Sequence, residues 1–344
     1  MQALRKLSHG HDRVAVVDVP EPQAGEGQVV VKVERAGVCG TDIHILHDQY
    51  SKVRPPVTLG HEFAGSIAEV GPGVQNWRAG DRVAVESEAH HCGLCRDCLS
   101  GFTNLCSERL AYGSTSDGGF ASYVAVRASA LPLLPEKVTF QEAALSEPLA
   151  VGVHAVMECG NIKAGDWVLV TGPGPIGLIV LQVLKSLDAR VIITGTEKDE
   201  HRLEIAVGIG ADYVLRVDRD NLHDVILDLT DDVGIDTAFE CSGTSFALND
   251  CLSSVKRHGQ IIQVGLFGRA VETELDQIAL KEIMLTGAFA HNHRTWIKAM
   301  DLIENKTIDL KTLISGEFPL SDWREAFQIS EEGKGIKYLL CPND

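Results

Sequence analysis

The chain has 344 residues, of which 44% are apolar, so it is long enough for about two domains, each with its own buried core. It carries 31 lysines and arginines against 48 aspartates and glutamates, a formal net charge of −17. Such an acidic surface repels nucleic acid and anionic lipid, and the composition excludes a disordered chain or a small disulfide-stabilised protein. We therefore expect a small neutral or weakly charged molecule as the partner, and neither nucleic acid nor a membrane.

The sequence shows no targeting or membrane segment. Residues 1–10 lack the apolar stretch of a secretory signal peptide. The most apolar segment, residues 167–183, contains the run Gly172-Pro173-Gly174-Pro175, which would break a membrane-spanning helix in its first third. A strand, a tight turn and a buried helix fit this segment better, and we expect a cytoplasmic protein.

The chain changes character near residue 150. Before it, short segments rich in valine, alanine and aromatic residues are separated by glycine and proline, which predicts the strands of a compact, irregular barrel. After it, continuous apolar stretches alternate with helical ones, as the buried parallel strands of a doubly wound sheet require. The barrel strands are expected at 29–33, 65–70, 81–85 and 120–126, and the six parallel strands at 167–171, 190–194, 213–217, 235–240, 261–264 and 283–286.

The pattern turns helical and polar again after about residue 288. The last segment is therefore expected to return to the first domain. We predict an α/β protein in which residues 1–149 and 289–344 form a β-rich domain and residues 150–288 form an inserted dinucleotide-binding domain.

A glycine-rich turn predicts the nucleotide site. Gly172-Pro173-Gly174-Pro175-Ile176-Gly177 fits G-x-G-x-x-G directly after one predicted strand and at the start of a helix. In this pattern Gly172 allows the tight turn, Gly174 lets the backbone approach a pyrophosphate, and Gly177 lets the helix pack on the strand. Pro175 and Ile176 complete the cofactor-binding turn.

An acidic residue follows at the spacing expected for a ribose ligand. Glu197 lies twenty residues beyond Gly177, where a carboxylate binds the adenosine ribose and repels a 2′-phosphate, so NAD is favoured over NADP. Lys198 and Arg202 lie nearby and act against this preference. The alternative is that the glycines only shape a βαβ turn and Glu197 is a solvated surface charge.

Four of the nine cysteines cluster between residues 92 and 106. Cys92, Cys95, Cys98 and Cys106 are spaced three, three and eight residues apart, and four thiolates on one loop can enclose a structural zinc ion with no open position. Chance clustering of buried thiols is one alternative. A zinc ribbon that reads nucleic acid is another, but the acidic residues of this lobe argue against it.

A second group of metal-binding residue types lies in three separate segments: Cys39, His61 with Glu62, and Glu147. Three protein ligands with one open position are typical of catalytic zinc. Spacing alone does not join these segments, because a lone Cys39 or His61 is more often a buried core residue or a satisfied imidazole.

Five motifs together resemble a known family over almost the whole chain. They are Cys39-Gly40-Thr41-Asp42-Ile43-His44, Gly60-His61-Glu62, the four-cysteine lobe, Glu147-Pro148-Leu149 and the glycine turn. In order and spacing they are similar to the zinc-dependent medium-chain alcohol dehydrogenases, closest to the branch of sorbitol (polyol) and threonine dehydrogenases. The resemblance implies a GroES-like β-rich catalytic domain with an inserted Rossmann domain, two zinc ions and NAD.

The resemblance also implies roles for individual residues. Cys39, His61 and Glu62 would occupy the catalytic zinc site, and Glu147 would bind the metal or hold its water. Thr41 would receive the alcohol proton, His44 would lie on a relay to solvent, and Asp42 would orient His61. Further cofactor-binding positions are Arg202, Cys241, Val264, Gly265, Leu266 and Phe289.

The implied reaction is hydride transfer from a secondary alcohol to NAD, giving the ketone, with zinc as the Lewis acid. Residues 147–154 resemble the polyol-oxidising members, so a polyol or sugar alcohol is the predicted substrate. Thr41-Asp42-Ile43-His44 resembles the threonine-oxidising members, so an L-threonine 3-dehydrogenase-like activity is the alternative. A non-catalytic zinc-stabilised nucleotide-binding protein is a third possibility.

Two points stay open in the sequence. His291-Asn292-His293-Arg294 stands where sorbitol-type members carry an Arg-Tyr pair before Thr-Trp, and its basic residues either bind a phosphate or face solvent. Members of the family are usually dimers or tetramers, and the strand predicted near residues 282–286 lies where such subunits pair sheet edges. A homo-oligomer is therefore expected.

Overall fold

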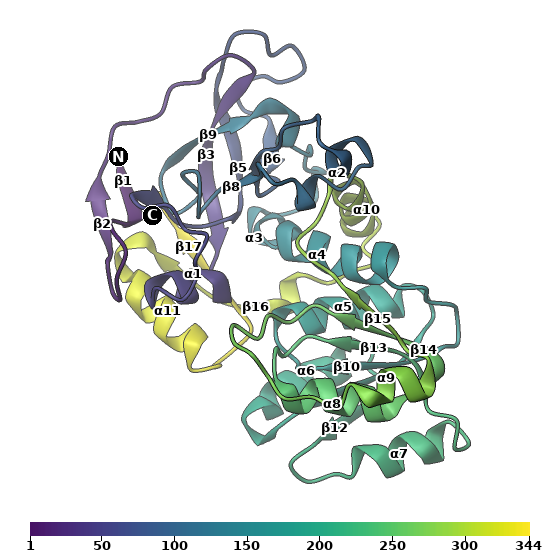
Figure 1. Ribbon diagram of the computed structural model, residues 1–344. Coiled ribbons are helices and arrows are strands. Elements are labelled where there is room, and N and C mark those ends of the chain that lie inside the picture. The colour runs from purple at the N-terminus through teal and green to yellow at the C-terminus, as the bar shows by residue number, and fades with distance from the viewer. The chain divides into compact units, whose positions relative to one another are not determined.

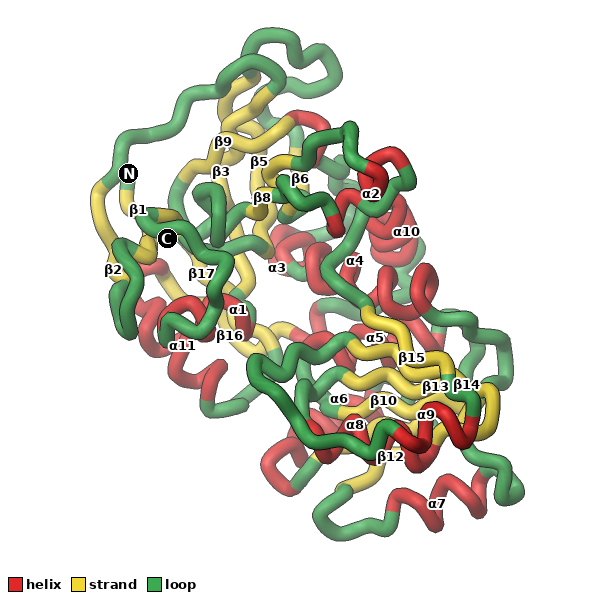
Figure 2. Tube along the Cα trace, viewed as in Figure 1, coloured by secondary structure: helices red, strands yellow, loops and turns green.

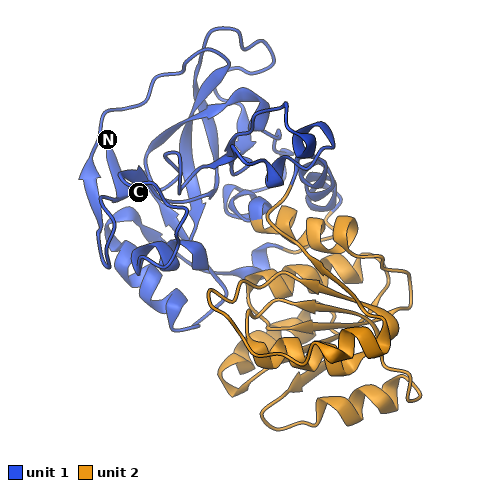
Figure 3. Cartoon of the chain, viewed as in Figure 1, with its two compact units in different colours: residues 1–147, 292–305, 310–344 blue, residues 148–291, 306–309 orange.

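The computed structural model describes all residues, 1–344, and the chain divides into two compact units (Figure 3). The sequence boundaries predicted at 149/150 and 288/289 compare with observed changes of unit at 147/148 and 291/292. A short segment, residues 306–309, also groups with the second unit. Unit 1 comprises residues 1–147, 292–305 and 310–344, and unit 2 comprises residues 148–291 and 306–309.

Unit 1 is built on β-sheets whose strands pair antiparallel except for the parallel pair β16 and β17 (Figures 1 and 2). Its largest sheet has the order β16-β17-β3-β5-β6, and β9 also pairs with β3. A second sheet has the order β2-β1-β4, and β7 pairs with β8. The strands are β1 (Gln2–Lys6), β2 (Val14–Asp18), β3 (Gln28–Gly37), β4 (Val57–Thr58), β5 (Glu62–Val70), β6 (Arg82–Ala84), β7 (Glu88–His90), β8 (Leu110–Ala111), β9 (Tyr123–Arg127), β16 (Ile314–Pro319) and β17 (Lys337–Cys341).

The core of unit 1 fills the space between these sheets and its helices. Val31, Phe63 and Phe120 from the sheets and loops join Trp323 and Phe327 from the last helix in one buried cluster. Burying aromatic and branched side chains in this way supplies the main favourable free energy of folding. The helices of this unit are α1 (Gly40–Leu46), α2 (Arg96–Leu99), α3 (Phe140–Ala144), α10 (His293–Glu304) and α11 (Trp323–Glu331), and α4 (Ser146–Val153) begins in it.

Unit 2 is a doubly wound parallel sheet. All five neighbouring strand pairs are parallel, and the order β12-β11-β10-β13-β14-β15 reverses direction between β10 and β13, as in the Rossmann fold. The strands are β10 (Trp167–Thr171), β11 (Arg190–Gly195), β12 (Tyr213–Arg216), β13 (Ile235–Glu240), β14 (Val255–Gln263) and β15 (Met284–Gly287). The helices between them are α5 (Pro175–Lys185), α6 (Glu200–Gly208), α7 (Leu222–Leu229), α8 (Ser245–Ser254) and α9 (Asp276–Lys281).

The predicted α/β fold class, with its six parallel strands, is confirmed, and the starts of two of these strands are corrected. β14 begins at Val255, six residues before the predicted start, because its polar first half, Lys-Arg-His-Gly-Gln, hides the strand from an apolar pattern. β15 begins at Met284, since Glu282 takes a left-handed conformation with φ 50° at the end of α9. Every helix falls short of the length and apolar content that a bilayer crossing requires.

Candidate functional site

Sheet register brings three predicted metal ligands together in unit 1. β3 pairs antiparallel with β5, with Gly37 opposite Glu62. Cys39 lies two residues beyond Gly37 and caps α1, and His61 directly precedes Glu62. One ligand atom from each of Cys39, His61 and Glu62 lies within 4.8 Å of the other two. The catalytic zinc ligands predicted from three motifs therefore form one cluster, apart from Glu147.

Asp42, in the first turn of α1, contacts two residues of this cluster. Asp42 is fully buried, and its Oδ2 accepts a hydrogen bond from the Cys39 amide at 3.0 Å. Its Oδ1 has no hydrogen-bond partner and lies 3.9 Å from His61 Nδ1. The pKa of Asp42 is raised, because the effect of burial exceeds the opposing effect of the nearby His61 imidazole. A buried carboxylate oxygen directed at a ligand imidazole is the arrangement that orients histidines at metal centres.

Negative groups dominate the electrostatics of the cluster. Burial alone would lower the pKa of His61, but the Cys39 thiolate and the Asp42 and Glu147 carboxylates raise it well above its usual range. An imidazole surrounded by anions marks a position that attracts a cation. A thiolate, an imidazole and a carboxylate also match the ligand types of zinc. The residues present therefore fit a zinc ion.

A buried lysine, which the sequence motifs did not reveal, holds the Glu62 carboxylate. Lys337 on β17 is 2% exposed and donates to both oxygens of Glu62 at 2.8 Å. Burial works against the charged ammonium, but Glu62 and Cys39 raise the pKa of Lys337, so it stays protonated. Glu62 is thus fixed in position and its charge is compensated. The glycine at position 37 leaves room for the same carboxylate, because a Cβ there would collide with the Glu62 side chain.

Glu147 lies in the first turn of α4 and is bound by a second unpredicted residue. Its side chain is 8% exposed, and its Oε1 accepts a hydrogen bond from the buried Ser87 hydroxyl at 3.1 Å. Glu147 is not part of the three-residue cluster, but its charge reaches His61 and Lys337. A serine outside any motif gives no sequence signal for this contact.

The two predicted proton-transfer residues lie on α1. The Thr41 hydroxyl oxygen lies 3.9 Å from Cys39 Sγ, beside the metal-ligand cluster. His44 is exposed, and its Nδ1 pairs with Gln49 Oε1 at 3.1 Å. Because residues three apart share one face of a helix, the helix carries a hydroxyl near the cluster and an imidazole near solvent.

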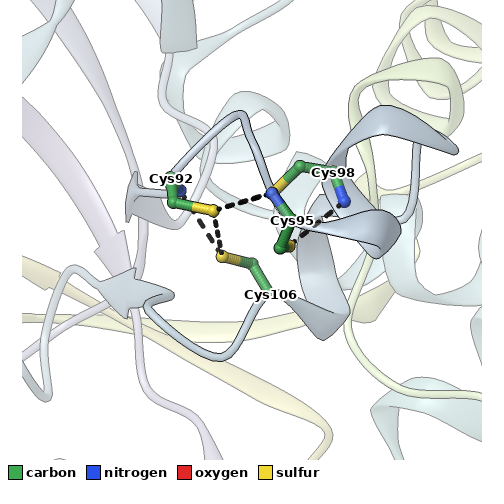
Figure 4. A group of neighbouring side chains, drawn as sticks. All are labelled: Cys92, Cys95, Cys98 and Cys106. Atoms are coloured by element: carbon green, nitrogen blue, oxygen red, sulfur yellow. Dashed lines mark hydrogen bonds between the residues drawn. The ribbon is translucent and has the colours of Figure 1, made fainter.

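The four predicted structural ligands form a second cluster in unit 1 (Figure 4). The Cys92 sulfur lies 3.9 Å from the Cys98 sulfur and 3.6 Å from the Cys106 sulfur. Four sulfurs at about 2.3 Å from one tetrahedral zinc ion are about 3.8 Å apart, so the spacing fits the ion. The amides of Leu94 and Cys95 donate to Cys92 and lower its pKa to about 7, which favours the thiolate that a metal needs.

The glycine turn of unit 2 adopts the geometry that the motif predicts. It connects β10 to α5, with Gly172 at φ +88° and Gly174 as the N-cap. A Cβ on Gly177 would overlap the Gly172 carbonyl oxygen, whereas a Cβ on Gly174 would meet no atom within 4 Å. Gly177 is therefore needed for helix packing, and Gly174 leaves open space at the helix N-terminus, where Pro175 takes the first position.

The other predicted cofactor residues follow the carboxyl ends of neighbouring strands, apart from Arg202 on α6. Doubly wound sheets bind ligands outside this edge, where the strand order reverses. Glu197 follows β11, Cys241 follows β13, Val264, Gly265 and Leu266 follow β14, and Phe289 follows β15. The structure thus gathers residues from four parts of the sequence at one edge of one sheet.

Two charged residues at this edge were missed. Glu240 ends β13 fully buried, and its Oε1 accepts bonds from the Ser242 and Gly243 amides at 2.9 and 2.8 Å, which shapes the loop after the strand. Arg216 ends β12 and lies 3.9 Å from Glu197. A charged residue closing an apolar strand was the available signal for both.

Charges around Glu197 bear on the choice of cofactor. Arg216 also pairs with Asp218 at 2.9 Å and Glu200 at 3.9 Å. Arg202 pairs with Asp199 at 3.6 Å. Four carboxylates thus accompany two guanidinium groups, and both cations are engaged. The surplus negative charge opposes a 2′-phosphate.

The basic run near residue 293 makes contacts within the protein. His291 and Asn292 are 2% exposed, and Asn292 caps α10. His293 Nδ1 lies 2.7 Å from Glu86 Oε1, and this bond raises the pKa of His293. The Arg294 guanidinium lies 6.0 Å from the centre of the Phe102 ring. The positive charge of His293 is therefore compensated by a carboxylate.

Comparison with known protein families gives two matches along the chain. Residues 25–136 match the family described as alcohol dehydrogenase GroES-like domain, and residues 175–305 match the one described as zinc-binding dehydrogenase.

Three curated relatives match nearly the full length. The chain is 42% identical to the sorbitol dehydrogenase of Halalkalibacterium halodurans, over 100% of both chains. It is 38% identical to the D-arabitol-phosphate dehydrogenase of Enterococcus avium, over 100% of this chain and 98% of that one. It is 35% identical to an L-threonine 3-dehydrogenase of Xanthomonas euvesicatoria, over 94% and 95% of the two chains.

Solved structures share the fold over 99% of both chains. A zinc-binding dehydrogenase of Sinorhizobium meliloti bound to NADP has a TM-score of 0.89 at 30% identity. An alcohol dehydrogenase of Escherichia coli complexed with NADH has a TM-score of 0.90 at 28% identity.

The glycine turn yields a matched pair of variants. Gly177→Ala should lower the free energy of unfolding by about 1–3 kcal/mol even without nucleotide, because its Cβ forces α5 away from the turn. Gly174→Ala should change stability by less than about 0.5 kcal/mol but weaken dinucleotide binding, because its Cβ projects into the open space at the helix end. Denaturant unfolding and NADH fluorescence titration measure the two effects. Equal stability loss in both variants would contradict the assignment.

Proposed function

The chain belongs to the zinc-binding dehydrogenases with a GroES-like alcohol dehydrogenase domain, and we propose that it oxidises a secondary alcohol of a polyol or sugar alcohol to the ketone, with NAD as hydride acceptor. The observation that carries the proposal is the buried cluster of Cys39, His61 and Glu62.

The residues of the cluster and their hydrogen-bond partners have separate proposed roles. Cys39, His61 and Glu62 would hold a zinc ion, and Glu147 would bind it or hold its water. Zinc supplies a Lewis acid that lowers the pKa of an alcohol hydroxyl. Asp42 orients His61, Lys337 fixes Glu62, and Ser87 fixes Glu147. The separate four-cysteine lobe holds a structural zinc ion.

The proton and the hydride leave the substrate by different routes. The Thr41 hydroxyl, beside the cluster, accepts the alcohol proton, and the exposed His44 passes it to solvent. The residues at the carboxyl edge of the parallel sheet hold the dinucleotide, with its pyrophosphate at the glycine turn. NAD is favoured because the carboxylates near Glu197 oppose a 2′-phosphate.

Substrate class is argued from relatives and from charge. The relatives named above act on sorbitol, a pentitol phosphate and threonine, and the greatest identity among these three, 42%, is to the sorbitol enzyme. His293, one of the basic residues of the 291–294 run, is bound to Glu86. A neutral polyol is therefore favoured over its phosphate. Threonine oxidation remains the second candidate, because Thr41-Asp42-Ile43-His44 resembles that branch.

We also propose that two copies associate through the edge of the parallel sheet. β15 is the last strand of the sheet, and its open edge offers unpaired backbone groups. Leu280, Met284 and Leu285 on and near it are 70%, 63% and 39% exposed. A second copy would cover these apolar side chains and continue the sheet, giving a dimer or, as a dimer of dimers, a tetramer.

A cytoplasmic location is proposed as well. None of the nine cysteines forms a disulfide in the structure, which suits a reducing compartment. Cell fractionation that recovers the protein outside the soluble cytoplasmic fraction would contradict this location.

A substrate panel tests the proposed reaction. Purified enzyme with NAD is given sorbitol, other sugar alcohols, their phosphates and threonine, and NADH is followed at its absorbance. Sugar alcohols should give the highest kcat/KM, and NADP in place of NAD should lower it at least tenfold. Turnover confined to threonine or to sugar phosphates would overturn the polyol assignment.

The two metal clusters should separate in mutants. The wild type should contain about two zinc ions per chain. His61→Ala should lose one ion and all measurable turnover while keeping the melting temperature within a few degrees. Cys95→Ser should lose the other ion and mainly lower the melting temperature, because four-thiolate zinc stabilises its loop. Elemental analysis, calorimetry and turnover assays measure these effects. Loss of turnover in Cys95→Ser with loss of stability in His61→Ala would contradict the assignment of catalytic and structural sites.

Charge at the sheet edge tests the proposed assembly. Leu285→Lys should shift the particle to a smaller size, since a lysine on an edge strand opposes strand pairing. Leu94→Lys, on the four-cysteine lobe and 82% exposed in the wild type, serves as the control and should keep the native size. Sedimentation velocity measures both. If only Leu94→Lys dissociates the particle, the interface lies at the four-cysteine lobe and the proposed β15 interface is wrong.

A further inference from the structure

A pair of histidines lies in unit 1 outside both cysteine-containing clusters. His11 is on the turn between β1 and β2, and His47 ends α1. His47 Nδ1 lies 2.9 Å from His11 Nε2, and His47 Nε2 lies 2.7 Å from Glu331 Oε1 on α11. Three segments distant in sequence therefore meet through two imidazoles and one carboxylate.

The spacing of the two imidazoles is close to that of a shared metal ion. Two nitrogens at about 2.05 Å from one ion are about 2.9–3.3 Å apart when the angle at the metal is between 90° and tetrahedral. The observed separation is 2.9 Å, and the ring centres are 5.0 Å apart. The two nitrogens face each other along a hydrogen bond, so both rings must rotate for their lone pairs to converge on one ion.

Glu331 selects the required form of His47. The Glu331 carboxylate accepts a hydrogen bond from His47 Nε2, so the neutral form of His47 has its lone pair on Nδ1, facing His11. A carboxylate behind a ligand imidazole is the usual support of metal-binding histidines. His11 can present its Nε2 lone pair to an ion when its ring proton is on Nδ1, because a neutral imidazole has one free ring nitrogen in either tautomer.

The backbone of the two histidines is held in place without a metal. Lys6 is fully buried, and its ammonium donates to the carbonyls of Gly10 at 2.6 Å and Ile45 at 2.8 Å. The Asp12 amide donates to the Leu46 carbonyl at 2.9 Å. These bonds join the turn to the end of α1 beside both imidazoles, so the pair is preorganised.

Neighbouring carboxylates are already paired with cations. Asp48 lies 3.4 Å from Lys6 and 3.6 Å from His9, and Asp12 lies 2.9 Å from Arg324. The two imidazoles are thus the direct donors, Glu331 supplies compensating charge, and water can fill the remaining positions.

We propose that His11 and His47 form a further binding site for a divalent transition-metal ion of the class that prefers imidazole, such as zinc, with Glu331 as the supporting carboxylate. The ion joins the β1–β2 turn to α1 and α11. Because it binds the folded chain, it raises the melting temperature as the free zinc concentration rises above the Kd of the site.

Calorimetric titration with zinc chloride tests the site on enzyme whose two cysteine-containing clusters are already loaded. The wild type should bind one further equivalent at micromolar concentrations, with a rise in melting temperature. His11→Ala and His47→Ala should each lose that equivalent, and Glu331→Gln should weaken it about 10–100-fold. His258→Ala removes another exposed histidine, which lies 3.3 Å from Glu282, and should leave binding unchanged.

The variants also control for misfolding. His11 lies on an exposed turn, so His11→Ala should keep wild-type turnover and the wild-type melting temperature in the absence of added zinc. The proposal is overturned if the wild type binds no further equivalent below about 100 μM, or if His11→Ala and His258→Ala lose binding equally. Since the readout is binding, it stands or falls independently of the substrate.

Discussion

The antiparallel pairing of β3 with β5 is the constraint on which the proposed catalytic centre depends. Its register sets Gly37 opposite Glu62, so the chain leaves β3 into Cys39 at the point where His61 and Glu62 enter β5. β17 pairs with the end of β3 and contributes Lys337, which holds Glu62. A one-residue slip in this register would turn the side chains of β5 to the opposite face and separate the donors.

The second constraint is the reversal of strand order in the parallel sheet. Because β10 and β13 are neighbours, the glycine turn after β10 and the loop after β13 lie at one edge, as dinucleotide binding requires. Glu240 shapes that loop through its buried carboxylate. The unit therefore combines a backbone turn for phosphates with a side chain that fixes the neighbouring loop.

Motifs and strands that depend on residues close together in sequence could be predicted, and contacts between distant segments could not. The glycine turn, the four-cysteine lobe and most strands follow from short patterns, and the resemblance to a family joined Cys39 to His61. Lys337 and Glu240 were missed because one charged residue beside apolar neighbours has the same local pattern whether it contacts the site or solvent, and Ser87, between Glu86 and Glu88, belongs to no motif. The bond between His11 and His47 depends on how two turns meet, which periodicity does not encode.

Anomalous diffraction at the zinc absorption edge tests whether Cys39, His61 and Glu62 bind a zinc ion. The account predicts a peak at about 2.3 Å from the Cys39 sulfur and about 2.1 Å from a ring nitrogen of His61. A crystal grown from zinc-replete enzyme that shows a strong peak within the four-cysteine lobe but none between Cys39 and His61 would contradict it.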